Sequence, residues 1–129
     1  MFKGSSDENS VSKLVLELNN FRAALTRLRR DYTKIIVTHT NEENSAGGPY
    51  VVKLAEIVSS ANLVEFFMVE LVDTLVVDVD RFGPNVAVEN CLRNAVFELY
   101  EQNDVNPFFL EKMKEIQTII FSHISILSK

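Results

Sequence analysis

The sequence has little that could carry cross-links or features of secretion. Cys91 is the only cysteine among the 129 residues, so the chain cannot form an internal disulfide bond. No Asn-x-Ser/Thr glycosylation sequon occurs either. Both absences are typical of a reducing intracellular compartment. We therefore expect a cytoplasmic protein, and the nucleus is also compatible with these features.

Membrane and lipid signals are equally scarce. The first ten residues, MFKGSSDENS, include no apolar segment of the kind found in a secretory signal. Phe2 stands where N-myristoylation requires glycine, and no CaaX box ends the chain. The apolar stretch 63–79 includes four acidic residues, and 116–127 is about half the length that a spanning helix needs. We expect no membrane insertion.

Motifs for catalysis and cofactor binding are missing. Gly47-Gly48-Pro49 lacks the continuation of a phosphate-binding loop. His39 and His123 have isoleucine three residues before them, so the Glu-x-x-His motif of di-metal bundles is absent. Cys91 has no histidine or basic neighbour, which favours a buried packing role over a nucleophile. The sequence predicts no enzyme activity, no catalytic or metal-binding residue and no cofactor.

What the sequence does contain is apolar residues at helical spacing. Between residues 11 and 35 they recur at alternating intervals of three and four residues, a heptad seam of more than three repeats. The seam consists of Val11, Leu14, Leu18, Phe21, Leu25, Leu28, Tyr32 and Ile35. It predicts a long amphipathic helix over about 11–40, capped by Asn9 or Ser10. The polar residues 1–10 are predicted to form a disordered tail.

The same spacing predicts three further helices. A second seam runs from Tyr50 to Leu75, beside an extra row of valines, so this helix is predicted to be buried on most sides. We expect these helices over about 50–81, 85–102 and 107–127. Asn106 is the expected cap of the last one. The weakest stretch of the second helix is 59–62, where a bend or break is expected if the helix has one.

Four amphipathic helices joined by short loops predict an all-α antiparallel helical bundle, with residues 11–129 as a single domain. The first two helices would be about 45 Å long and the other two shorter, so the long pair is expected to extend beyond the bundle. Apolar surface exposed there favours a protein partner or self-association. In a homodimer the first helix would contribute Leu14, Phe21, Leu28 and Ile35.

Charge is unevenly distributed along the chain. Residues 11–40 hold six basic and two acidic residues, whereas 41–129 hold six basic and 14 acidic residues. By heptad position, Arg22 and Arg29 lie beside the seam, where we expect them to cover apolar surface and pair with acids of a neighbouring helix. The candidate acids are Glu65, Glu70 and Asp73.

Other basic side chains fall on the outer face of the first helix. They are Lys13, Arg27, Arg30 and Lys34. A solvated helix face, phosphate binding and an acidic protein partner are three readings of this strip. Among nucleic acids duplex RNA fits best, because it requires only shape and phosphate contacts and no aromatic residue interleaves these bases.

Two functional hypotheses follow. The first is a non-enzymatic adaptor, scaffold or self-associating bundle that binds protein through apolar helix surface. The candidate residues for its apolar patch are the phenylalanines that fall off the best seams, Phe66, Phe82, Phe97 and Phe108. The alternative is nucleic-acid binding through the basic strip. His123 lies on the last seam and is expected to be a hydrogen-bonded core or edge residue.

Overall fold

The fold was analysed in a computed structural model that describes residues 5–41, 48–102 and 106–127, with side chains described for 10–39, 48–102 and 106–124. The chain forms four helices, α1 (Ser5–Asn41), α2 (Gly48–Phe82), α3 (Pro84–Glu101) and α4 (Pro107–Leu127). No strand occurs in the described residues. The predicted all-α helical bundle is confirmed.

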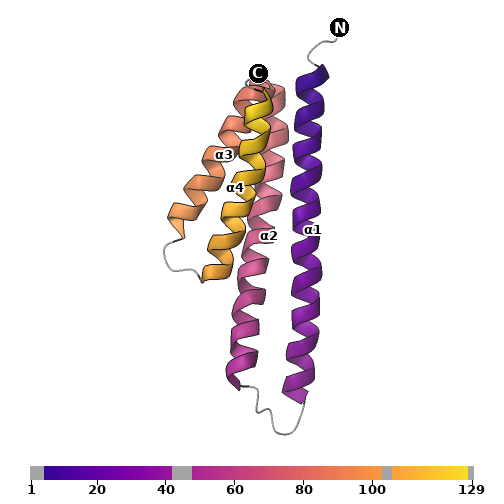
Figure 1. Ribbon diagram of the computed structural model, residues 1–129, viewed down its shortest axis with the longest axis vertical. Coiled ribbons are helices and arrows are strands. Elements are labelled where there is room, and N and C mark those ends of the chain that lie inside the picture. The colour runs from indigo at the N-terminus through magenta and orange to yellow at the C-terminus, as the bar shows by residue number, and fades with distance from the viewer. Residues whose placement is uncertain (1–4, 42–47, 103–105, 128–129) are drawn as a thin grey trace.

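Each helix runs antiparallel to the one before it (Figure 1). The helices α1 and α2 have 37 and 35 residues, whereas α3 and α4 have 18 and 21. Because of this difference, the end of the α1–α2 pair where the chain turns back extends beyond α3 and α4, as the seams predicted (Figure 1). None of the described helices combines the length and apolarity needed to cross a membrane.

One hydrophobic core joins all four helices. Each helix contributes side chains three or four residues apart, which the helical repeat places on one face. The fully buried members with the largest side chains are Leu14, Leu18, Met68, Leu75, Phe109, Met113, Ile116 and Ile120. Burial of one such side chain stabilises the fold by about 1.5–3 kcal/mol, so the bundle depends on this shared seam rather than on any single helix.

The sharp turns have local causes. Gly83 separates α2 from α3 with a φ of 89°, a value that glycine adopts without steric cost. At the start of α4, the Asn106 side-chain oxygen accepts a hydrogen bond from the backbone N–H of Phe109 at 3.2 Å. The Asn106 amide nitrogen donates to the backbone oxygen of Glu56 at 3.3 Å. The predicted asparagine cap is therefore confirmed, and it also ties α4 to α2.

The structure differs from two local expectations. The helix α1 begins at Ser5, so residues 5–10 are helical rather than part of a disordered tail, and residues 1–4 lie outside the described residues. The helix α2 continues through 59–62 without a break. Ala61 and Val64 are fully buried there while Ser59 and Asn62 are exposed. Packing of the apolar side chains therefore outweighs the low helix propensity of this stretch.

Two contacts and one turn set the relative heights of the helices. Arg29 pairs with Glu65, so these two residues lie at one level. Glu65 and Glu101 are equally far in sequence from Gly83, so α3 ends at about this level too. Asn106 contacts Glu56, which places the start of α4 lower. From the start of α1 down to the level of Arg29, four helices therefore surround the seam. Below Arg29, towards the turn between α1 and α2, three helices surround it, and only α1 and α2 remain next to the turn.

We call the region above the level of Arg29 the four-helix part. The region below it, residues 30–41 of α1 and 48–64 of α2, is the hairpin end. Leu14, Leu18 and Leu25 of the seam are buried in the four-helix part. Tyr32 and Ile35 continue the same seam in the hairpin end, where they are partly exposed.

Candidate functional site

A three-residue polar contact joins α1 to α2. The Arg29 Nε donates to Glu65 Oε2 at 2.7 Å, and its Nη2 donates to Oε1 at 3.3 Å. The Thr26 hydroxyl donates to Glu65 Oε1 at 2.8 Å. The predicted pairing of Arg29 with an acid of a neighbouring helix is confirmed, with Glu65 as the partner. Arg22 acts on Glu65 only through its charge.

This contact changes the titration of both charged groups. Burial by itself would raise the pKa of Glu65, but the hydrogen bonds from Arg29 and Thr26 outweigh it and hold that pKa below its ordinary value. The hydrogen bond to Glu65 raises the pKa of the Arg29 guanidinium. Both groups are therefore charged at neutral pH, and the pair holds α1 and α2 at a fixed height relative to each other.

The orientation of this contact defines a surface that faces away from α3 and α4. Viewed down its axis, α1 has Leu25 facing the core, Arg29 facing α2, and Arg30 exposed beyond Arg29 in the same sense of rotation. Around α2 the same sense of rotation passes from Met68 through Glu65 to exposed Asp73. Because the two helices are antiparallel, Arg30 and Asp73 lie on the same side of the pair.

We call this surface the outer face. Its α1 residues are Leu16, Ala23, Arg27, Arg30 and Lys34, and its α2 residues are Phe66, Val69, Glu70, Asp73 and Val77. All ten are exposed. The residues that α1 and α2 bury point to the opposite side, where α3 and α4 pack. Two long helices thus present one shared surface of apolar and charged side chains.

The apolar part of the outer face includes large side chains. Leu16 is 60% exposed, Phe66 64% and Val77 48%. A hollow of about 370 Å³ opens between the two helices near the start of α1. It is lined by Val11, Ser12, Val15, Val76 and Val79. Apolar surface of this kind on a helix pair is typical of a protein-binding region.

The exposed valines of α2 overturn one sequence prediction. Its second valine row was expected to be buried, yet Val69 and Val76 are exposed. No described residue of α3 or α4 belongs to the outer face, because both short helices pack on the other side of α2. The sequence showed that α2 had two apolar sides but not that only one of them would be covered.

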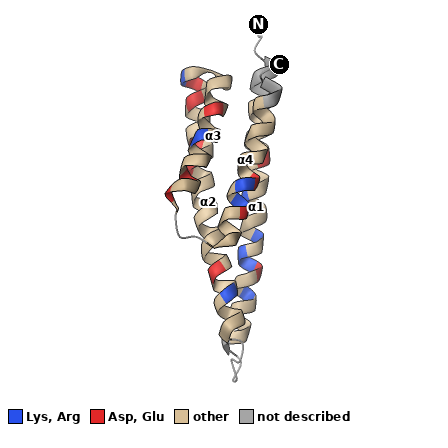
Figure 2. Cartoon of the chain, turned by 60° about the vertical axis from the view of Figure 1, so that its left-hand side comes forward, with Lys and Arg blue, Asp and Glu red and all other residues tan. Residues whose placement is uncertain are grey.

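The charges of the outer face are segregated. Lys and Arg gather along the lower part of α1, and Asp and Glu are spread along α2 and α3 (Figure 2). Arg27, Arg30 and Lys34 are exposed and have no ion pair within the described residues. Lys13 is also exposed but lies fourteen residues before Arg27, about 21 Å along the helix. The structure therefore unites three of the four predicted basic residues in one strip.

The four candidate phenylalanines do not form one patch. Phe66 lies on the outer face, whereas Phe82 ends α2 about 24 Å further along the helix. Phe97 is exposed on α3, on the side opposite buried Ala95. Phe108 is partly buried against the core, with the Lys112 ammonium 5.3 Å from its ring centre. Only Phe66 belongs to the larger apolar surface.

The predicted use of the α1 seam in a homodimer is wrong for its upper half. Leu14 is fully buried and Phe21 packs against the core of the same chain. Leu28 and Ile35 are only partly exposed. The upper half of the seam is therefore occupied by α2, α3 and α4 of the same chain.

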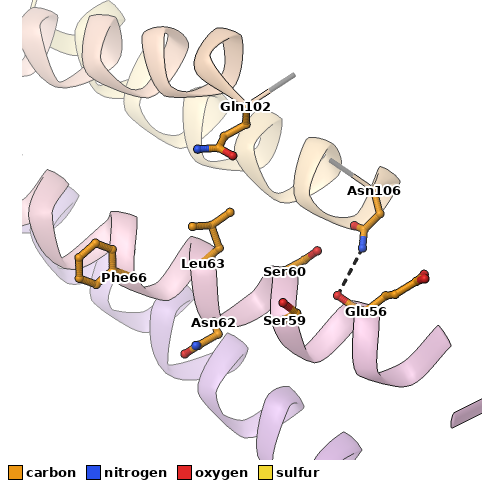
Figure 3. A pocket seen from close by; sticks show the side chains of 8 residues that line it. All are labelled: Glu56, Ser59, Ser60, Asn62, Leu63, Phe66, Gln102 and Asn106. Atoms are coloured by element: carbon orange, nitrogen blue, oxygen red, sulfur yellow. Dashed lines mark hydrogen bonds between the residues drawn. The ribbon is translucent and has the colours of Figure 1, made fainter. Parts of the chain in front are cut away.

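A second hollow, of about 810 Å³, lies between α2 and the ends of α3 and α4 that face each other (Figure 3). Its described lining is mostly polar, and Leu63 points across it towards Gln102 (Figure 3). The lining residues are Glu56, Ser59, Ser60, Asn62, Leu63, Phe66, Gln102 and Asn106. Glu56 is the only ionisable group among them.

Two further polar groups lie inside the bundle. His123 is buried, and its Nε2 shares a hydrogen bond with the Glu17 carboxylate of α1, which confirms its prediction as a hydrogen-bonded core residue. Sequence reasoning missed Glu17, although its position beside the seam was a usable signal.

Burial, reinforced by the charge of Asp78, raises the pKa of Cys91 to about 12. This thiol is therefore protonated and unreactive at neutral pH.

Within the described part of the chain, no three His, Cys, Asp or Glu residues are placed to hold a metal ion together. Comparison with known proteins found no similar protein. No protein-family model matches the chain, and no curated protein or solved structure matches it significantly. The outer face of α1 and α2 is thus the strongest candidate site, and its function is argued from its own geometry and chemistry.

Proposed function

We propose that this protein is a non-enzymatic, cytoplasmic interaction module that binds protein through the outer face of α1 and α2. It would serve as an adaptor, a scaffold or a self-associating bundle. One observation carries the proposal. The outer face exposes Leu16 and Val77 beside an apolar hollow, and Phe66 further along α2, on two helices that already have a complete core on their other side.

Apolar surface that is exposed to water has a free-energy cost. Isolated exposed apolar residues are common, but a band shared by two helices keeps apolar area in water that a partner would remove. Phe66 supplies the aromatic anchor that is typical of interface centres. The charged residues on the same face can orient the partner, since exposed charges contribute more to specificity and association rate than to affinity.

The test compares two surfaces of the same bundle. In one variant Leu16→Glu and Val77→Glu place charge on the outer face. In the control, Phe97→Glu places charge on α3, where the native side chain is 62% exposed. Both variants should keep the helical circular dichroism and the thermal midpoint of the unchanged protein, since all three positions are exposed.

Affinity capture from cell extract then identifies bound proteins, and each is tested again with purified components. We expect the unchanged protein and the Phe97→Glu control to bind the purified partner equally. The Leu16→Glu, Val77→Glu variant should bind it at least tenfold more weakly. Equal binding by both variants, or loss only in the control, would place the interaction elsewhere and refute the proposal.

A second candidate function is binding of duplex RNA. The observation that favours it is the strip of Arg27, Arg30 and Lys34, exposed and without ion pairs in the described residues. Fluorescence anisotropy with labelled duplex RNA at two salt concentrations tests it. Binding that weakens steeply with salt, and that Arg27→Glu with Arg30→Glu abolishes while Lys13→Glu does not, would support this function. No binding at low salt would exclude it.

A further inference from the structure

We infer that the protein bound on the outer face is a second copy of this chain, packed with α1 of one copy over α2 of the other. The inference rests on the proposed function and names its partner. The two copies are related by a two-fold axis parallel to the helices. Three features of the outer face lead to this arrangement: the position of its charges, the heights of its side chains and its area.

The first feature is charge complementarity. A two-fold axis perpendicular to the helices would stack α1 on α1 and leave the acids of α2 without opposite charges. An axis parallel to the helices instead stacks α1 on α2. This parallel axis brings α1, with Arg27, Arg30 and Lys34, over α2, which carries Glu70 and Asp73. Arg27, at the end of the strip nearest these acids, then faces the opposite charge of Glu70 rather than another basic residue.

The second feature is height. Rotation about an axis parallel to the helices does not move any residue along that axis. Two residues that are level within one copy are therefore also level across the interface. Arg29 is level with Glu65. Arg27, two residues before Arg29, is therefore level with Phe67, and Glu70 is three residues further, about 4.5 Å along α2. An arginine and a glutamate side chain can bridge this offset.

The apolar side chains match at the same time. Leu16 lies thirteen residues before Arg29 and is level with Asp78, thirteen residues after Glu65. Val77 immediately precedes Asp78 in the sequence. Leu16 lies near the far edge of α1 and Val77 near the far edge of α2, and the two-fold rotation brings these edges together. Each dimer would contain every such pair twice, as a self-complementary interface requires.

The third feature is area. The side of the α1–α2 pair that includes the outer face runs along two helices of 37 and 35 residues, so this whole side is about 50 Å long and about 20 Å wide. Its area of about 1,000 Å² exceeds the roughly 800 Å² that each partner contributes to a standard interface. The apolar side chains can supply the affinity, while the exposed ion pairs select the arrangement because such pairs add little energy of their own.

Charge reversal with rescue tests the pairing directly in the full chain. Sedimentation equilibrium of the unchanged protein should show a dimer. Arg27→Glu alone places two glutamates opposite each other, and Glu70→Lys alone places lysine opposite arginine, so each variant should dimerise at least tenfold more weakly. An equimolar mixture of R27E and E70K restores both ion pairs in the heterodimer and should dimerise as the unchanged protein does. The control Arg93→Glu, exposed on α3, should leave dimerisation unchanged.

Cysteine cross-linking tests the geometry independently. A mixture of Leu16→Cys and Val77→Cys chains should form a disulfide-linked dimer under mild oxidation. Leu16→Cys alone should not, because the two-fold rotation places the two Leu16 positions at opposite edges of the dimer. The buried native Cys91 does not interfere. Cross-linking of Leu16→Cys with itself, or no rescue in the R27E and E70K mixture, would overturn the proposed arrangement.

The outcomes separate this inference from the proposed function. A chain that stays monomeric up to millimolar concentration overturns the second copy as partner. If the Leu16→Glu, Val77→Glu variant still loses a purified partner in that case, the outer face binds a different protein and the proposed function stands. A monomer that binds duplex RNA through Arg27 and Arg30 overturns the inference in favour of the RNA candidate. A monomer whose outer face binds neither protein nor RNA overturns both the inference and the proposed function.

Discussion

The four-helix part and the hairpin end of the molecule are built on one continuous seam, yet they bury it differently. Leu14, Leu18 and Leu25 are buried in the four-helix part. Tyr32 and Ile35, at the same heptad positions, remain partly exposed in the hairpin end. The difference arises because α3 ends at the level of Arg29 and α4 begins near Glu56. On α1, the heptad repeat therefore shows which side of the helix is apolar, but the number of neighbouring helices decides how far that side is buried. On α2, Leu54, Ala61 and Val64 stay buried in the hairpin end, where they face α1 and the start of α4.

The largest expected effect comes from removing a seam residue in each region. Leu18→Ala should lower the free energy of unfolding by about 3–4 kcal/mol, because Leu18 is fully buried and its truncation leaves a cavity. Ile35→Ala should cost only about 1–2 kcal/mol, because part of that side chain already contacts water. Urea unfolding followed by circular dichroism measures both. Equal losses would mean that the hairpin end is as well covered as the four-helix part.

The polar contact at the boundary of the two regions gives a smaller effect that depends on pH. Glu65→Gln should lower the free energy of unfolding by about 1–2 kcal/mol at pH 7, since it removes a partly buried charge-assisted hydrogen bond. The pKa of Glu65 is lower in the folded than in the unfolded protein. Its stabilisation is therefore present above the ordinary carboxyl pKa and is lost as the pH falls through the folded value.

Urea unfolding at pH 7 and at pH 3 measures this dependence. The unchanged protein should lose more stability between the two pH values than the Glu65→Gln variant does. Asp73→Asn on the exposed outer face serves as the control, with a loss like that of the unchanged protein. A Glu65→Gln variant with the full pH dependence would show that other carboxylates cause it.

Asn106 caps the start of α4 and ties it to α2 in the lower part of the bundle. Asn106→Ala removes the hydrogen bond from the Phe109 N–H and the link to Glu56, and should cost about 1 kcal/mol of unfolding free energy. Hydrogen exchange should speed up in the first turn of α4 while that of α1 stays unchanged. As a control, Asn94→Ala at an exposed position of α3 should change neither quantity.

The reactivity of the Cys91 thiol reports whether the four-helix part opens, and its effect on stability should be the smallest. Because burial raises the pKa of Cys91 to about 12, the folded thiol should react with an aromatic disulfide reagent only after unfolding in urea. An Ile35→Cys variant adds a thiol in the hairpin end, which should react in the folded protein. A rapid reaction of native Cys91 would show that the four-helix part opens readily.

The sign of the Cys91 contribution to stability follows from the raised pKa. The folded protein holds the thiol proton more tightly than the unfolded chain, so this contribution is complete below the ordinary thiol pKa. It decreases as the pH rises towards about 12. The unfolding free energy of Cys91→Ala should therefore depend less on pH in the alkaline range than that of the unchanged protein, measured by urea unfolding between pH 8 and pH 11.

Several particular features could be predicted from the sequence for clear physical reasons. The positions of the four helices follow from apolar spacing, and the start of α4 follows from Asn106, whose side chain can replace a missing backbone acceptor. Arg29 was predicted to pair across the seam because of its place beside it, and Glu65 was among its three candidate partners. These signals are local, or depend only on which residues share one side of one helix.

Other features were missed because they depend on helices that lie far apart in the sequence. Ala61 keeps α2 continuous through a weak stretch because the bundle buries it, which local propensity does not contain. Glu17 contacts His123 from α1 across to α4. Val69 and Val76 belong to an apolar row, yet they are exposed. In each case the decisive neighbour was unknown until the helices were placed together.

From the sequence alone it follows that this chain is helical, where its helices begin and end to within two residues except at the start of α1, and which side of each helix is apolar. Periodicity and turn residues act over short distances, so they are complete in the sequence. The packing of the four helices determines which of the two apolar sides of α2 is covered, and at what height α3 and α4 end. Those outcomes depend on helix lengths and packing partners across the bundle, and they left the outer face of α1 and α2 exposed.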